Sequence, residues 1–160
     1  MARLVYVGGF WPREIIRIDP AKINAAVATL GKIRILLADD HKPVMDAVSH
    51  ILSREFDVVG TVGDGQTLLD ETERLQPDLL VVDISMPVVN GIEAVRRLKE
   101  ASSEVKVVFL TVHESADYAR EAFAAGALGY VIKSRIASDL VDTIKSVLAG
   151  QRFVSPSITL

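Results

Sequence analysis

Apolar runs of strand length alternate with segments of helical periodicity from residue 33 onward. Several of these runs are apolar at consecutive positions, which is typical of parallel strands with both faces covered. Glycine and polar residues bound them, as expected for strand ends. The sequence therefore predicts an interior parallel sheet, with strands at residues 33–38, 58–62, 79–82, 105–110 and 129–132.

The segments between these runs repeat apolar residues at helical spacing, so that one face of each helix is apolar. Pro43 suits the first turn of the first helix, and Gly126 and Gly150 suit the ends of the last two. Five strand–helix units with right-handed crossovers favour a doubly wound open sheet. We expect an α/β fold with a five-stranded parallel sheet in three α/β/α layers. The predicted helices follow Pro43 to residue 52 and cover 66–76, 91–101, 116–125 and 140–148.

The composition narrows the class of protein. The chain has 160 residues, 49% of them hydrophobic and 24% charged, which is enough for one ordinary folded domain. No apolar run is long enough to cross a bilayer, so we expect a soluble protein without membrane contact. Cysteine is absent, which suits the cytoplasm. A net charge of -3 argues against direct nucleic-acid contact by this chain.

Residues 1–32 do not belong to the strand–helix alternation. Residues 4–7 could form a short strand, and Asp19-Pro20 is a suitable start for a helix that runs to Gly31. A secretory signal is not favoured, because the apolar stretch is short and runs into charged residues. We interpret residues 1–32 as a loosely docked extension of unknown role, ahead of a domain at residues 33–150.

Polar residues close four of the predicted strands. The first strand ends in Asp39-Asp40, the third in Asp83, the fourth in Thr111 and the fifth in Lys133. Ligands of open α/β sheets bind outside the carboxyl ends of the strands, so these side chains should share one edge. We expect three carboxylates, a hydroxyl and an ammonium group to converge there.

Clustered carboxylates repel one another unless a cation binds between them. Mg2+ is the natural cation, since it prefers oxygen ligands and is often held by one or two carboxylates together with phosphate oxygens. An ammonium group and a hydroxyl could then hold a phosphoryl group. The set predicts phosphoryl transfer to a carboxylate nucleophile.

Each of these residues has an ordinary interpretation when taken alone. An aspartate after a strand usually caps a turn or helix, a lone lysine is usually solvated, and a threonine is common in strands. Their joint occurrence in this strand order favours the site. The loop 60–65 lacks the phosphate-loop patterns and is interpreted as a turn. His41, His50 and His113 lack metal-ligand spacing, and a surface histidine is the favoured interpretation of His113.

Four sequence segments carry a family resemblance. The first segment is Ile33 to His41, which contains Asp39-Asp40. The second is Pro77 to Pro87, which contains Asp83 and is followed by Asn90-Gly91. The third is Leu110-Thr111, and the fourth is Gly126 to Lys133. With these segments, residues 33–154 resemble the response regulator receiver domain, which is CheY-like and flavodoxin-like in fold. The resemblance is to the branch that carries a LuxR/NarL-type helix-turn-helix effector. It further suggests that residues 151–160 begin a linker to an absent effector domain.

The resemblance implies a role for each site residue. Asp83 would be the phosphoacceptor, Asp40 the more direct Mg2+ ligand, Asp39 a ligand largely through water, and the carbonyl of Ser85 a further ligand. Lys133 would contact the phosphoryl group, and Thr111 and Tyr130 would be the switch pair. For Tyr130 alone, a half-buried strand-end aromatic would be the better guess. Val112 and Ser134 depart from the common pattern without removing a chemical group.

The function implied is a phosphorylation switch in two-component signal transduction. A sensor histidine kinase would donate the phosphate, and the phosphorylated chain would form a homodimer that controls transcription through the absent domain. The chain would promote its own phosphorylation and dephosphorylation without turning over an external substrate, so it is not expected to be an enzyme. The alternatives are an aspartyl-nucleophile phosphatase, which usually needs a second aspartate where Ser85 stands, and a flavodoxin-like mononucleotide binder, which needs a phosphate loop.

Overall fold

The computed structural model describes residues 3–4, 17–18 and 31–160 and divides the chain into two compact units, 1–32 and 33–160. In the first unit β1 (Arg3–Leu4) pairs antiparallel with β2 (Arg17–Ile18). The strand predicted at 4–7 is therefore described only at its first residue. The helix predicted from Asp19 lies outside the described residues except for Gly31.

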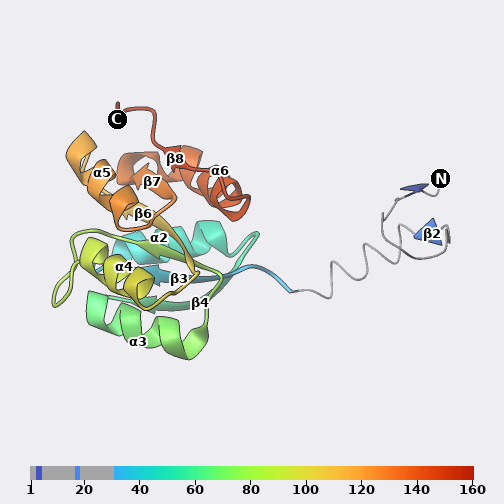
Figure 1. Ribbon diagram of the computed structural model, residues 1–160, viewed down its shortest axis with the longest axis horizontal. Coiled ribbons are helices and arrows are strands. Elements are labelled where there is room, and N and C mark those ends of the chain that lie inside the picture. The colour runs from blue at the N-terminus through green and yellow to red at the C-terminus, as the bar shows by residue number, and fades with distance from the viewer. Residues whose placement is uncertain (1–2, 5–16, 19–30) are drawn as a thin grey trace. The chain divides into compact units, whose positions relative to one another are not determined.

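The second unit is a doubly wound α/β sandwich (Figure 1). Its parallel sheet has the strand order β4-β3-β5-β6-β7-β8. The strands are β3 (Arg34–Ala38), β4 (Asp57–Val62), β5 (Leu79–Val82), β6 (Lys106–Thr111), β7 (Gly129–Ile132) and β8 (Phe153–Val154). The helices are α2 (Lys42–Leu52), α3 (Gly65–Leu75), α4 (Gly91–Glu100), α5 (Ala116–Ala124) and α6 (Ile136–Leu148), and a 3-10 turn covers Lys133–Arg135.

Two hydrophobic clusters fill the two faces of the sheet. Helices α2 and α6 cover one cluster, and α3, α4 and α5 cover the other. The central strand β5 is buried at all four positions and contributes alternate residues to the two clusters. The continuous apolar runs in the sequence arise from this two-sided burial, which confirms the predicted fold class.

Local signals at the helix ends agree with the sequence. The Asp64 side chain accepts a hydrogen bond from the Thr67 backbone N–H at the start of α3, and Asn90 accepts one from Glu93 at the start of α4. The loop after β4 thus serves as a turn and helix cap from Gly63, while residues 60–62 belong to the strand. Gly126 and Gly150 have φ values of +112° and +80°, as expected for glycines just beyond a helix end.

The sheet has six strands, so the predicted number of five is wrong. The additional strand β8 pairs with β7 through hydrogen bonds of 2.9 Å from Phe153 N to Leu128 O and from Ser155 N to Tyr130 O. A two-residue strand is too short to leave a periodic signal in the sequence. That residues 151–160 lead to a further domain stays a prediction.

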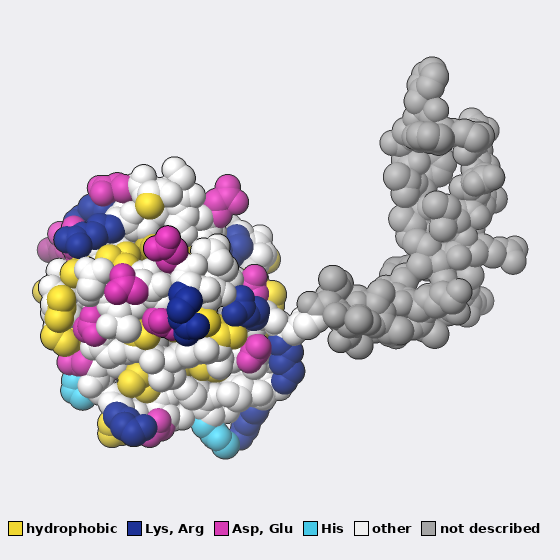
Figure 2. Space-filling model, turned by 90° about the horizontal axis from the view of Figure 1, so that it is seen from below, with side chains coloured by type: hydrophobic (Ala, Val, Ile, Leu, Met, Phe, Trp, Pro, Cys, Tyr) yellow, Lys and Arg dark blue, Asp and Glu magenta, His cyan; other side chains and the backbone are white. Residues whose placement is uncertain are grey.

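Among the described residues, no helix combines the length and apolar character required to cross a bilayer. Figure 2 shows acidic and basic side chains interspersed over the visible face of the second unit, with small apolar areas between them. On that face, charges of both signs therefore lie close together.

Candidate functional site

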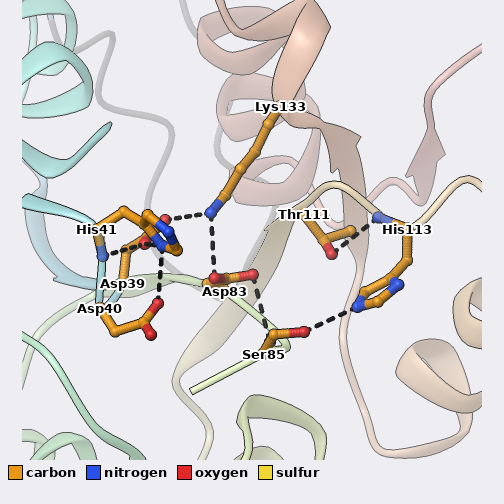
Figure 3. Close-up of polar contacts among 8 residues, drawn as sticks. All are labelled: Asp39, Asp40, His41, Asp83, Ser85, Thr111, His113 and Lys133. Atoms are coloured by element: carbon orange, nitrogen blue, oxygen red, sulfur yellow. Dashed lines mark hydrogen bonds and ion pairs between the residues drawn. The ribbon is translucent and has the colours of Figure 1, made fainter. Parts of the chain in front are cut away.

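The parallel register brings the polar strand ends to one edge of the sheet (Figure 3). Ala38 lies beside Val82 on the neighbouring strand, so Asp39 and Asp83 leave the sheet side by side. A hydrogen bond of 2.7 Å from Asp83 N to Ala38 O fixes this arrangement. Lys133 follows β7 and points back across the edge toward both carboxylates.

Lys133 forms ion pairs with two buried carboxylates. Its Nζ lies 2.7 Å from Asp39 Oδ2 and 3.1 Å from Asp83 Oδ2, and only the second contact has hydrogen-bond geometry. The side chain of Lys133 is 14% exposed and those of Asp39 and Asp83 are 7% and 4% exposed. Burial by itself would lower the pKa of Lys133, but Asp39 and Asp83 outweigh it and the pKa is raised. The lysine is therefore held in its charged form.

The pKa of the Asp83 carboxyl is raised, which is the opposite of what its ion pair with Lys133 would cause. Burial raises the pKa of this carboxyl, and Lys133 only partly offsets the effect, while the charge of Asp39 raises the pKa further. The ion pair alone would lower this pKa, but two buried carboxylates share a single ammonium group. The edge therefore carries an excess of negative charge that a further cation would relieve.

The residues present fit a hard divalent cation. Ligand atoms of Asp39, Asp40, His41 and Asp83 all lie within 4.8 Å of one another. Asp39 Oδ2 is buried, and its one charged neighbour in the described part of the chain, Lys133 Nζ at 2.7 Å, lacks hydrogen-bond geometry, so this oxygen can still bind a further cation. The exposed Asp40 side chain extends the cluster toward solvent. This donor set is mainly oxygen, as Mg2+ requires.

His41 lies closer to this cluster than its sequence spacing suggested. Its backbone N–H donates to Asp39 Oδ1 at 2.8 Å, and its ring Nδ1 lies 3.0 Å from Asp40 Oδ1. Asp39 thus also has the turn-capping role that the ordinary interpretation of a strand-end aspartate gives it. His41 orients both acidic side chains. Its position next to them was visible in the sequence, but the direction of its ring depends on the conformation of the turn.

Ser85 and His113 form a second polar group beside Asp83. The Ser85 N–H lies 3.4 Å from Asp83 Oδ1, and its hydroxyl lies 2.8 Å from His113 Nε2. The His113 ring also stacks on Tyr118, with 4.2 Å between ring centroids. His113 is therefore a half-buried neighbour of the site.

Thr111 and Tyr130 both contact the backbone of His113. The fully buried Thr111 accepts a 3.2 Å hydrogen bond at Oγ1 from His113 N. Tyr130 is also fully buried, and its hydroxyl donates to His113 O at 2.9 Å. Burial raises the pKa of this phenol. Tyr130 therefore lies fully inside the domain, and the interpretation as a half-buried aromatic at a strand end is wrong. Val112, which precedes His113, is 65% exposed.

The loop after Asp83 turns tightly. A Cβ atom at Gly91 would collide with the backbone oxygen of Asp83, so only glycine allows α4 to begin this close to the acidic edge. Val88 has φ of +68° and lies at the centre of a γ-turn closed by a 2.8 Å hydrogen bond from Val89 N to Pro87 O. This left-handed conformation is strained for a β-branched residue. The loop is thus compact and held close to Asp83.

Comparison with known proteins gives a consistent set of similarities. The profile of the family described as "Response regulator receiver domain" matches residues 35–145. The transcriptional regulatory protein DegU of Brevibacillus brevis is 36% identical over 131 residues, 81% of this chain and 56% of that protein. The response regulator GacA of Pseudomonas viridiflava is 36% identical over 128 residues, 79% of this chain and 60% of that protein. The chain therefore spans less than two thirds of these curated relatives.

Solved structures with the same fold include a two-component response regulator of the LuxR family from Aurantimonas sp. SI85-9A1. It superposes with a TM-score of 0.76 at 34% identity, over 80% of this chain and 93% of that one. The signal receiver domain of the putative response regulator NarL from Mycobacterium tuberculosis superposes with a TM-score of 0.67 at 25% identity, over 75% and 96%.

Proposed function

This chain belongs to the response regulator receiver family, as the receiver domain of a LuxR/NarL-type two-component response regulator, and we propose that Asp83 is its phosphoacceptor. The observation that carries the proposal is the contact of Lys133 Nζ with two buried carboxylates at the carboxyl edge of the sheet. That ammonium lies where a phosphoryl group on Asp83 would bring new negative charge.

In the proposed reaction a carboxylate oxygen of Asp83 attacks the phosphorus of a phosphohistidine on a sensor kinase. The P–N bond breaks, its electrons return to the imidazole, and an acyl phosphate forms on Asp83. Lys133 then pairs with a phosphoryl oxygen, and Thr111 turns its hydroxyl from the His113 backbone to donate to another oxygen. The same residues would support hydrolysis of the acyl phosphate, so the chain is a signal carrier with chemistry confined to itself.

The cation that suits this chemistry is Mg2+. Asp39, Asp40 and Asp83, with the backbone carbonyl of Ser85, would hold it. When bound, the ion neutralises charge on the phosphoryl oxygens and the acidic edge. Support for this assignment comes from the close spacing of the acidic ligand atoms and from two buried carboxylates, Asp39 and Asp83, that share the single ammonium group of Lys133.

The two alternatives have less support. A phosphatase with an aspartyl nucleophile would use an acid two residues after Asp83, where Ser85 instead contacts His113. A mononucleotide binder would need a phosphate loop, for which residues 60–65 are the glycine-rich segment that the sequence offers. That segment consists of the end of β4 and the capping residue Asp64.

The test is phosphorylation by acetyl phosphate, or beryllofluoride binding, with and without Mg2+. We expect uptake only with Mg2+, and none in Asp83→Asn. Asp70→Asn, an exposed carboxyl in α3 bonded to Gln66, is the matched control and should behave as wild type. An acid-stable, base-labile phosphoprotein formed by Asp83→Asn would refute the assignment. Hydrolysis of many unrelated phosphoesters would favour the phosphatase instead.

The proposed output is a homodimer that brings two effector domains to DNA and so controls transcription, in a cytoplasmic protein. Its support is the similarity to regulators named as transcriptional, including DegU. The switch residues would be Thr111 and Tyr130, which share the backbone of His113 just before α5. Light scattering with and without beryllofluoride tests the dimer: the mass should double at tens of micromolar, roughly the range of transient interfaces. An unchanged mass would point to a different output partner.

A further inference from the structure

The C-terminal tail, defined as residues 152–158, is packed into the receiver unit. Its strand β8 extends the sheet beside β7. Two of its side chains are buried: Ser155 is fully buried and Ile158 is 6% exposed. Arg152 lies over the ring of Phe123 in α5, with its Cζ 4.6 Å from the ring centroid. The tail therefore contacts both the sheet and a helix of the unit.

The Ser155 hydroxyl joins the tail to the end of β7. Its Oγ accepts a hydrogen bond of 3.1 Å from the backbone N–H of Ile132 and donates one of 3.3 Å to Asp139 Oδ2. Ile132 directly precedes Lys133, so this bond anchors the backbone one peptide before the residue that carries the Lys133 side chain. The tail thus supports the residue that reaches the acidic edge.

Asp139 secures the other side of the same turn. It accepts hydrogen bonds of 2.6 and 3.1 Å from the Arg135 guanidinium and one of 2.6 Å from the Ser138 hydroxyl. Arg135 closes the 3-10 turn that begins at Lys133. Ser155 therefore completes a partly buried polar network, with Ser155 and Asp139 as its buried members, on both sides of this turn. Because its hydrogen bonds are linked, one residue of this network cannot move without disturbing the others.

We propose that Ser155 is a positioning residue for Lys133, and that docking of the tail and binding of a phosphoryl group at Asp83 favour each other. The inference rests on the proposed function. A docked tail holds the backbone of Lys133 where its ammonium already faces Asp83, which lowers the ordering cost of anion binding. Because coupling between two sites is reciprocal, an anion held by Lys133 stabilises the docked tail to the same extent.

The coupling provides a route from the acidic edge to whatever follows residue 160. Phosphorylation would make the tail more firmly docked, so that the following chain leaves the domain from a fixed point and in a fixed direction. Ser155 N and Tyr130 O share a hydrogen bond, so the tail is also joined to the strand of the proposed switch tyrosine. The tail is thus a part of the signalling unit.

The test uses the full 160-residue chain, beryllofluoride with Mg2+ as the probe, and Ser155→Ala. We expect the variant to bind beryllofluoride about fivefold or more weakly, at the lower end of typical coupling between sites. The matched control is Thr72→Val, which removes another buried hydroxyl, bonded to Leu68 O in α3. That variant should lose thermal stability and keep wild-type affinity. A purely structural role for Ser155 would give the same result as the control and would refute the proposal.

A second readout needs no variant. Backbone amide exchange in residues 152–158 of the wild-type chain should slow severalfold on addition of beryllofluoride and Mg2+. Unchanged exchange there would overturn the inference even if Ser155→Ala failed to fold.

The assignment of Asp83 and the coupling of the tail would fail in different experiments. A wild-type chain that does not bind beryllofluoride contradicts the assignment of Asp83, whereas wild-type binding with an unaltered Ser155→Ala affinity contradicts the tail coupling alone.

Discussion

The two faces of the sheet are packed by helices of different character. Helix α6 fully buries the large side chains Leu140, Ile144 and Val147, whereas α5 fully buries two alanines, Ala119 and Ala122, with Phe123 only partly buried. The buried apolar area, and with it the free energy of docking, is much smaller for an alanine than for a leucine. Helix α6 should therefore be firmly anchored, and α5 should shift at low cost.

This difference matches the positions of the two helices relative to the site. Helix α6 follows the turn that carries Lys133, while α5 follows Thr111 and His113. A firm α6 would keep Lys133, for which contact with phosphate is proposed, in place. A weakly anchored α5 can respond when the hydrogen bonds of Thr111 and Tyr130 to His113 are exchanged. The sheet thus carries a firmly anchored helix, α6, on one face and a weakly anchored helix, α5, on the other.

The largest expected effect is on the packing of α6. Leu140→Ala should lower the free energy of unfolding by about 2–5 kcal/mol, because it leaves a cavity beneath α6. The counterpart on α5, Ala122→Gly, should cost about 1 kcal/mol from helix propensity. Urea denaturation with an unchanged slope measures both. Equal losses would show that α5 is anchored as firmly as α6.

A smaller change in the free energy of unfolding is expected from two ion pairs, Arg135–Asp139 at the start of α6 and Arg120–Asp117 in α5. Arg135 lowers the pKa of the buried Asp139 carboxyl, and Ser138 and Ser155 add to the shift against the effect of burial. A lowered folded-state pKa stabilises the fold above the unfolded value of 3.8, and this contribution is lost as pH falls through the folded-state pKa. Asp139→Asn should therefore cost about 1 kcal/mol at pH 7.

The cost of Asp139→Asn should shrink as the pH falls below 3.8. Asp117→Asn on α5 is the control, since Asp117 is 89% exposed in its pair with Arg120 and should contribute little at any pH. Urea denaturation at several pH values measures both variants. A constant difference between Asp139→Asn and wild type across this range would contradict the assigned role of the carboxylate.

The smallest effect is expected from deletion of residues 1–32. Both hydrophobic clusters consist of residues from 33 onward in the described part of the chain, so each face should keep its packing. The melting temperature should stay within about 2 °C of the full chain, and beryllofluoride binding should be unchanged. A loss of several degrees would show that this segment packs on the receiver unit.

Much of the fold could be predicted from local pattern. The five longer strands and all five helices of the second unit lie within a few residues of their predicted positions, because two-sided burial imposes continuous apolar runs and one-sided burial imposes helical spacing. The polar strand ends were equally visible, since parallel strands must end at a common edge. The sequence by itself thus determined the layer order and the group of residues at the acidic edge.

Only the tertiary structure decided the contacts between segments that carry no periodic signal. Strand β8 exists because β7 offers an unpaired edge, and Ser155 matters because folding places it beside Ile132 and Asp139. His113 gained its neighbour Ser85 in the same way. These contacts join residues that are far apart in the chain. The composition and local spacing of one sequence do not show which distant residues will meet.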